Sequence, residues 1–177
     1  MQKKIIITGG PSTGKSSLIE NLKVKGYFCM EEVSRKVTLE ARKKGIEHLF
    51  ISSPIIFSEI LMEKRVIQYH QAEKQAESIV FFDRGIIDIH AYLNFSKTKH
   101  NIDFNSILKD IAYDQVFICP PWKEIHQTDN ERYESFEEAN LIHTELMESY
   151  LEKGYSVIDV PFGSIEERTN FITNKVF

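Results

Sequence analysis

The sequence has little of what marks secreted, membrane-spanning or nucleic-acid-binding proteins. Its 177 residues include only two cysteines, Cys29 and Cys119, which are too few for a disulfide framework and do not have a metal-type spacing. No stretch approaches the roughly 20 apolar residues of a membrane-spanning helix, and the apolar run Ile5–Ile7 is too short for the core of a signal peptide. The net charge of -4 provides no overall attraction for nucleic acid. We therefore expect a cytoplasmic protein with no membrane span and no nucleic-acid partner.

Internal repeats, low-complexity segments and Pro/Gly-rich linkers are also lacking, which predicts a single domain over residues 1–177. Short apolar runs alternate with longer stretches of helical periodicity, as in βα units around a parallel sheet. Five runs are expected to be strands: Ile5–Ile7, Tyr27–Met30, Ile79–Phe82, Gln115–Ile118 and Ser156–Val160. The predicted fold class is therefore α/β, with three layers around a five-stranded sheet.

Helices are expected between and after these strands. Four helices are predicted at Leu18–Lys25, Val33–Lys44, Pro54–Glu77 and Ser135–Lys153. A fifth helix is predicted to begin at Ser164. The last two helices in the chain start with a capping box, in which a serine and a glutamate three residues later bond the free N–H groups of the first turn.

A glycine-rich loop between the first expected strand and helix carries the clearest functional signal. It fits the pattern Gly, four residues, Gly, Lys, Ser, formed here by Gly9, Gly10, Pro11, Ser12, Thr13, Gly14, Lys15 and Ser16, with Ser17 directly after. Glycines bring backbone N–H groups close to phosphate oxygens, and the helix N-terminus behind the loop favours an anion. We expect Lys15 to reach the β- and γ-phosphates and Ser16 to offer its hydroxyl oxygen to Mg²⁺. The loop therefore predicts a bound nucleoside triphosphate with magnesium.

Charged residues follow two of the other expected strands. Asp83 ends the run Ile79–Phe82 at the sheet edge where ligands bind, and we expect it to hold the magnesium rather than to act only as a turn residue. Arg84 comes next; its guanidinium either grips a phosphate or substrate group or pairs with a neighbouring carboxylate. Glu31 and Glu32 follow the second strand, and Glu32 is our candidate general base, although both also fit the charge pattern of a helix start.

The segment from about residue 120 to 135 is polar, rich in turn-forming residues and long enough to be a functional loop. We expect it to form a small lid. Within it, Arg132 is a candidate for neutralising the charge that spreads over a transferring phosphoryl group. The alternative is that Arg132 balances the acidic helix that follows it.

Several of these segments together resemble one family. They are the phosphate loop and the stretches Phe82–Gly85, Phe117–Trp122, Glu131–Ala139 and Glu166–Arg168. Over nearly the whole chain the sequence is similar to the small AAA-domain P-loop ATPases related to the ribosylnicotinamide kinase domain of the bacterial NAD-regulatory protein. The resemblance implies a fold like that of nucleoside and nucleotide kinases, with strand order 2-3-1-4-5, and ATP with magnesium as cofactors. It also implies that Asp83 and Arg84 match the acidic-Arg motif of these kinases and that Arg132 matches their lid arginine.

Two departures from related patterns bear on the activity. The expected lid has one arginine where many nucleotide kinases carry several, which weakens the kinase assignment. The chain also has no room for the helical subdomain of AAA-type motors, so we do not expect a hexameric unfoldase. The guanine-recognition motif Asn-Lys-x-Asp is absent, which favours ATP and leaves GTP open.

The sequence therefore predicts a magnesium-dependent phosphoryl transferase that acts on an unidentified small hydroxylated acceptor, for instance a nucleoside-like one. Lys15, Asp83, Arg84, Arg132 and Glu32 are its predicted catalytic residues. Two alternatives remain open: an ATPase or nucleotide-dependent switch with a protein or lipid partner, and a binding module without turnover.

Overall fold

A computed structural model describes residues 2–127 and 134–176. At its centre, five parallel strands pair in the order β2-β3-β1-β4-β5. The strands are β1 (Lys3–Gly9), β2 (Phe28–Met30), β3 (Ile79–Asp83), β4 (Gln115–Cys119) and β5 (Val157–Asp159). The predicted fold class and strand order are therefore confirmed.

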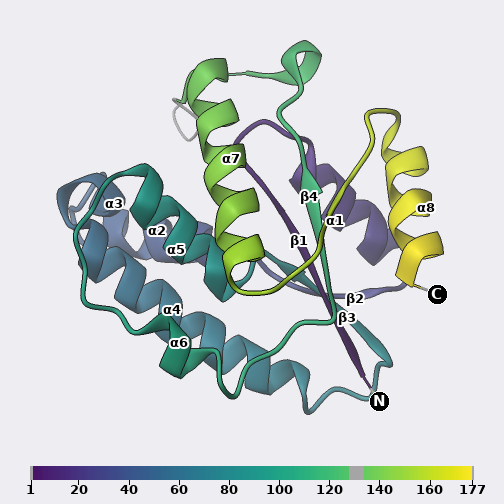
Figure 1. The fold of residues 1–177 in the computed structure, drawn as a ribbon, viewed down its shortest axis with the longest axis horizontal. Coiled ribbons are helices and arrows are strands. Elements are labelled where there is room, and N and C mark those ends of the chain that lie inside the picture. The colour runs from purple at the N-terminus through teal and green to yellow at the C-terminus, as the bar shows by residue number, and fades with distance from the viewer. Residues whose placement is uncertain (1, 128–133, 177) are drawn as a thin grey trace.

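Helices cover both faces of the sheet (Figure 1). One face packs against α1 (Lys15–Val24) and α8 (Ile165–Val176). The other face packs against α2 (Val33–Lys43), α3 (Leu49–Ser52), α4 (Pro54–Ala72), α5 (Ile86–Phe95), α6 (Phe104–Ile107) and α7 (Phe136–Glu152). A short 3₁₀ turn, η1 (Lys123–Ile125), follows β4. In the part of the chain that the structure describes, no helix is long and apolar enough to cross a membrane.

The central strand β1 shows why the sheet is buried on both sides. Ile5 and Ile7 belong to the core that includes α1 and α8, while Ile6 belongs to the core on the opposite face. Side chains alternate between the two faces of a strand, so a strand covered on both sides needs apolar residues at every position. This arrangement holds β1 rigidly, together with the glycine-rich loop that follows it.

Several helices differ from the sequence-based expectation: α1 begins at Lys15 rather than Leu18, and the short helices α3 and α6 were not expected. Helix α4 ends at Ala72 rather than Glu77, because residues 73–78 are all exposed and offer the core no apolar side chain. Helix α5 was not expected at all. Six of its ten residues are buried, including Asp88, so it lacks the one-sided apolar pattern by which surface helices are recognised.

Candidate active site

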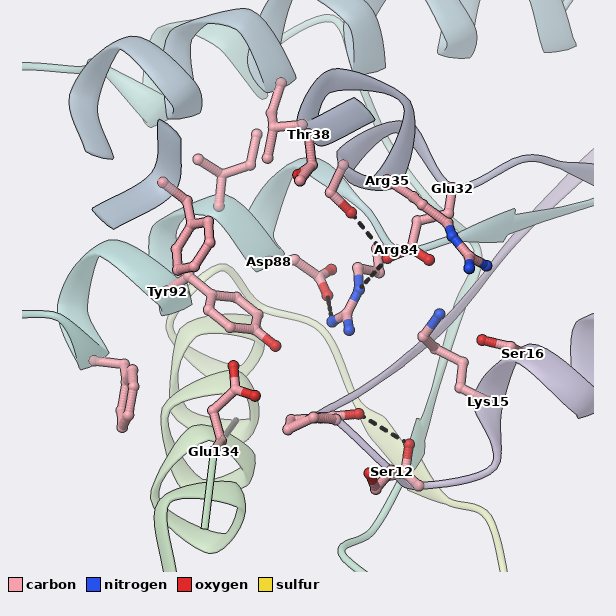
Figure 2. A pocket seen from close by; sticks show the side chains of 18 of the residues that line it. Ser12, Lys15, Ser16, Glu32, Arg35, Thr38, Arg84, Asp88, Tyr92 and Glu134 are labelled. Atoms are coloured by element: carbon pink, nitrogen blue, oxygen red, sulfur yellow. Dashed lines mark hydrogen bonds and ion pairs between the residues drawn. The ribbon is translucent and has the colours of Figure 1, made fainter. Parts of the chain in front are cut away.

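The candidate functional residues gather where β1, β3 and β4 end at the same edge of the sheet. The strand registers place Ile7 beside Asp83 and Gly9 beside Cys119. The loop after β1 and the turn after β3 are therefore neighbours in space. Figure 2 shows side chains from both converging with side chains of α2 and α5. This is the edge at which open α/β sheets bind ligands.

The loop from Gly9 to Ser17 has the backbone of a phosphate cradle. Gly9 and Gly14 have φ angles of +150° and +76°, and a Cβ atom on Gly9 would lie 2.7 Å from the carbonyl oxygen of Cys119. Helix α1 begins at Lys15, so the N–H groups of its first turn lie at the end of the loop without partners inside the helix. Unpaired N–H groups and the helix dipole both favour an anion at this point.

Lys15 and Asp83 form a buried ion pair at the base of the site. Nζ of Lys15 contacts Oδ1 of Asp83, and each side chain is 6% exposed. Because a buried charge is costly without an opposite charge beside it, each residue stabilises the other. Asp83 thus lies next to the phosphate loop, as predicted, but behind Lys15 rather than on the cavity wall.

The oxygen donors at this edge fit magnesium. Ser16 is exposed at the cavity wall and supplies a hydroxyl oxygen, and Asp83 supplies a carboxylate. In residues 2–127 and 134–176, no group of three or more His, Cys, Asp or Glu side chains is arranged to hold a metal ion. Magnesium commonly binds through one or two protein oxygens together with water and substrate phosphates. Ser16 and Asp83 therefore fit a magnesium ion that is carried by a nucleotide.

Arg84 lies between two carboxylates at the start of the turn after β3. Its Nε is 3.5 Å from Oε1 of Glu32, and its Nη1 is 3.3 Å from Oδ1 of Asp88. Its backbone has a φ of +70°, and its N–H donates to the carbonyl of Ile7. The guanidinium also lies 5.5 Å from the ring centroid of Tyr92. The carboxylate pairing that the sequence left as an alternative is therefore present, and it fixes Arg84 at the cavity wall.

Asp88 is the buried residue that connects this turn to the rest of the protein. Its carboxylate accepts hydrogen bonds from the Tyr150 hydroxyl at 2.6 Å, from the Gly85 N–H at 2.8 Å and from the Thr8 hydroxyl. Burial opposes ionisation, but the charges of Arg65 and Arg84 outweigh it and hold the pKa of Asp88 below its usual value. Asp88 is therefore a fixed negative charge that orients Arg84.

Glu32 is one of the acidic residues that line the cavity. Burial favours its neutral form, but the charges of Lys15 and Arg84 and a hydrogen bond from Ser34 lower its pKa to about 2. Its neighbour Glu31 instead pairs with Lys36 at the surface, and both of those side chains are more than half exposed. Of the two glutamates considered from the sequence, Glu32 is thus the one at the site, and it is ionised at neutral pH.

One cavity of about 1150 Å³ connects the phosphate loop to a compartment between the helices. One end is lined by residues 10–17 of the loop together with Trp122, Ile125 and residues 163–165. The other end, the helical compartment, lies between α2, α3, α4 and α5 and has apolar or aromatic walls formed by Leu39, Phe50, Phe57, Leu61, Tyr92 and Phe95. Figure 2 shows Arg84 between Lys15 on one side and Tyr92 on the other.

Glu134 adds an acidic group to the wall of this cavity. Its side chain faces Tyr92 in Figure 2, and its Oε2 is buried without a hydrogen-bond partner in the part of the chain that is described. Burial raises the pKa of this carboxyl group. A ligand that donates a hydrogen bond here would complete the contacts of Glu134.

The structure therefore brings together Lys15, Ser16, Glu32, Asp83 and Arg84, as the sequence predicted. Arg132 and the centre of the expected lid lie outside the described residues, so the lid remains a prediction. On the described side, the Ser12 hydroxyl donates to the carbonyl of Gln127 at 2.6 Å, which joins the segment after η1 to the phosphate loop.

Several cavity residues were missed from the sequence. Asp88 and Tyr92 are four positions apart in α5, a spacing that places both on one side of that helix, next to the turn that carries Arg84. That spacing was a usable signal, although the burial of α5 concealed the helix itself. Arg65 and Arg168 belong to α4 and α8, and nothing local in the sequence connects them to the site.

The strand order and the glycine-rich loop at the end of β1 define a P-loop domain with the fold of nucleoside and nucleotide kinases. The model of an AAA domain family matches residues 4–168, and the chain belongs to this family. No curated protein sequence matches the chain.

Solved structures of similar fold include three kinds of protein. Deoxyadenosine kinase from M. mycoides with bound dATP matches with a TM-score of 0.70 and 16% identity over 98% of both chains. NadR protein in complex with NR matches with a TM-score of 0.72 and 21% identity over 99% of this chain, which corresponds to 48% of NadR. Thymidylate kinase from Candida albicans matches with a TM-score of 0.69 and 16% identity, over 99% of this chain and 91% of the kinase.

Proposed function

We propose that this protein is a magnesium-dependent phosphoryl transferase that moves the γ-phosphoryl group of ATP to a hydroxyl group of a small, nucleoside-like acceptor. The observation that carries the proposal is the shape of the cavity. It runs from the phosphate loop past Arg84 into the helical compartment, so there is room for a second molecule beyond the phosphates. A protein that only bound or hydrolysed a nucleotide would not need this compartment.

The walls of the helical compartment indicate the kind of acceptor. Phe50, Phe57 and Tyr92 offer aromatic surface suited to a flat ring. Glu32 and Glu134 offer acceptors for hydroxyl groups close to this surface. Similar folds are found in proteins named as deoxyadenosine and thymidylate kinases and in NadR bound to NAD and AMP-PNP, which supports the nucleoside-like class.

The proposed roles follow from position and charge. The loop Gly9–Ser17 holds the triphosphate. The Lys15 ammonium group moves from Asp83 to the transferring phosphoryl group, and Arg84 balances the charge that develops on that group. Glu32 accepts a hydrogen bond from the acceptor hydroxyl and orients it. Because Glu32 is only weakly basic, it takes the proton late, when the new bond to phosphorus has largely formed.

Ser16 and Asp83 would hold the magnesium, Asp83 directly or through water. When bound, magnesium neutralises charge on the β- and γ-phosphates. Arg132 remains our candidate for a further positive charge over the phosphates, and GTP remains an alternative donor.

Acceptor-dependent turnover tests the proposal. The protein is incubated with Mg²⁺-ATP, alone and with a panel of nucleosides and related vitamins, and ADP release is measured. We expect release that depends on one acceptor class and is lost in Lys15→Ala. ADP release at the same rate with and without every acceptor would instead indicate an ATPase or switch. ATP binding without ADP release would indicate a binding module without turnover.

A further inference from the structure

Arg168 of α8 lies buried against the phosphate loop, although 155 positions separate it from the loop residue it contacts. It is 2% exposed, and its Nη1 donates to the carbonyl oxygen of Thr13 at 3.0 Å. Its guanidinium carbon is 5.7 Å from the ring centroid of Trp122, which covers it on another side. Arg168 also belongs to the cavity lining at the loop.

The charge of Arg168 has no counterpart among the residues that the structure describes. Among the residues that the structure describes, no carboxylate pairs with it, and its Nε and Nη2 are buried without acceptors. Burying an unpaired ion destabilises a fold even after its surroundings have relaxed. The nearby buried carboxylate, Asp83, is already paired with Lys15. Within residues 2–127 and 134–176, Arg168 is therefore a positive charge beside the loop that no carboxylate neutralises.

The contact with Thr13 also determines how the loop presents an N–H group. The Thr13 carbonyl and the Gly14 N–H belong to one planar trans peptide unit, so they point in opposite directions. With the carbonyl held by Arg168, the Gly14 N–H is directed to the side of the loop facing away from Arg168. Residue 14 must be glycine here, because its φ is +76° and a Cβ atom would lie 2.6 Å from Nη1 of Arg168.

We propose that Arg168 is a positioning residue of the phosphate loop, which aims the Gly14 N–H at the phosphates and whose unbalanced charge is neutralised by the bound triphosphate. The inference rests on the proposed nucleotide site, but not on the identity of the acceptor. It gives the last helix of the fold a direct part in nucleotide binding.

The variant Arg168→Met tests the proposal, because it keeps an unbranched side chain while removing the charge and the hydrogen bond. The melting temperature is measured without ligand, with Mg²⁺-ATP and with inorganic tripolyphosphate, and dissociation constants are measured by calorimetry. Without ligand, we expect the variant to melt at the wild-type temperature or above it, because an unpaired buried charge has been removed. Both ligands should bind roughly 10- to 100-fold more weakly, as expected for the loss of a charged hydrogen bond.

Two further variants make the result decisive. Glu166→Gln removes an exposed contact of the same helix, in which Lys25 Nζ lies 2.6 Å from Glu166 Oε1, and it should leave both affinities at the wild-type value. Arg168→Lys keeps the charge without the planar donor geometry, so it should bind both ligands with intermediate affinity. This variant replaces Arg168→Met in the test if Arg168→Met does not fold.

Equal affinities for wild type and Arg168→Met would overturn the inference. So would a variant that melts lower without ligand but shows the wild-type shift with ATP, because Arg168 would then only support the fold. A wild-type protein that binds neither ATP nor tripolyphosphate would instead contradict the proposed function itself.

Discussion

Individual charged residues decide the chemistry of this site, and the ion pair between Lys15 and Asp83 lies at its base. Asp83→Asn keeps the shape of the side chain but removes its charge. We expect ATP affinity in the presence of magnesium to fall about tenfold, in line with the loss of one metal-supporting group. Affinity without magnesium should stay equal or rise, because Lys15 would be left without its carboxylate. The ratio of the two affinities, measured with magnesium and with a chelator, checks this; an unchanged ratio would remove Asp83 from the metal site.

Glu32 gives a second prediction, on stability against pH. Its pKa is lowered from 4.5 to about 2 in the folded protein, so the folded state is stabilised above the unfolded pKa and loses this stabilisation as the pH falls from about 4.5 to about 2. Glu32→Gln should therefore be less stable than wild type at neutral pH, by up to about 3 kcal/mol. The difference should shrink towards zero near pH 2. Urea unfolding of both proteins between pH 2 and 7 measures it, and a constant difference across that range would show that Glu32 is not held ionised by its neighbours.

Site residues whose roles depend on neighbouring positions in the sequence were predicted well. The phosphate loop is contiguous, and Asp83 and Arg84 directly follow a recognisable strand. Arg65 and Arg168 could not be predicted, because their contacts with Gly85 and Thr13 arise only when α4 and α8 pack onto the sheet. The pairing of Arg84 with Asp88 lies between these cases, since its four-residue spacing is visible but the burial of Asp88 is not.

Helices α5 and α7 are joined at the site by the hydrogen bond from Tyr150 to Asp88. Tyr150 is fully buried, and its hydroxyl lies 2.6 Å from the carboxylate that orients Arg84. Tyr150→Phe should lower the free energy of unfolding by about 1.5–3 kcal/mol, the usual contribution of a hydrogen bond to a charged group. It should also slow turnover more than it weakens ATP binding, because it loosens Arg84 rather than the phosphate loop.

Tyr155→Phe is the matched control for this change. The Tyr155 hydroxyl accepts a longer hydrogen bond of 3.3 Å, from the N–H of Tyr113, outside the site. We expect a smaller loss of stability and normal turnover. If both tyrosine variants behaved alike, the link from α7 to Arg84 would have no special role.

Whole elements were predicted where one face is polar and the other apolar, as in α7 with its capping box at Ser135 and Glu138. Helix α5 could not be recognised from the sequence, because a helix enclosed by α4 and α7 is buried over most of its length and lacks a broad polar face. The end of α4 was also predicted too late, since the polar residues after Ala72 are good helix formers that nothing in the fold holds in place.

At the scale of the whole molecule, the proposed transfer requires that the two ends of the cavity bind different molecules. Thr38 lines the cavity from α2 and is visible there in Figure 2. Thr38→Phe should fill part of the helical compartment and raise the acceptor KM about fivefold or more, because overpacking a binding surface costs at least about 1 kcal/mol. ATP affinity should change less than twofold. Lys43→Phe, an exposed change on the same helix, is the control; a loss of ATP affinity in Thr38→Phe would mean that the two ends are not separate sites.

The overall fold could be predicted from the sequence, because each βα unit has a recognisable pattern of apolar residues and a parallel sheet allows only a few strand orders. The helical compartment could not be predicted from the sequence, since its walls come from four separate helices between residues 33 and 95. The sequence therefore predicted an acceptor, but the place proposed for its binding depends on tertiary structure.

Titration calorimetry of the purified, folded protein with Mg²⁺-ATP most directly tests whether the main-chain cradle after β1 captures a triphosphate. The account predicts saturable binding of one ATP per chain, abolished in Lys15→Ala while that variant keeps its fold. Absence of binding for both ATP and GTP, or equal binding by Lys15→Ala, would contradict it.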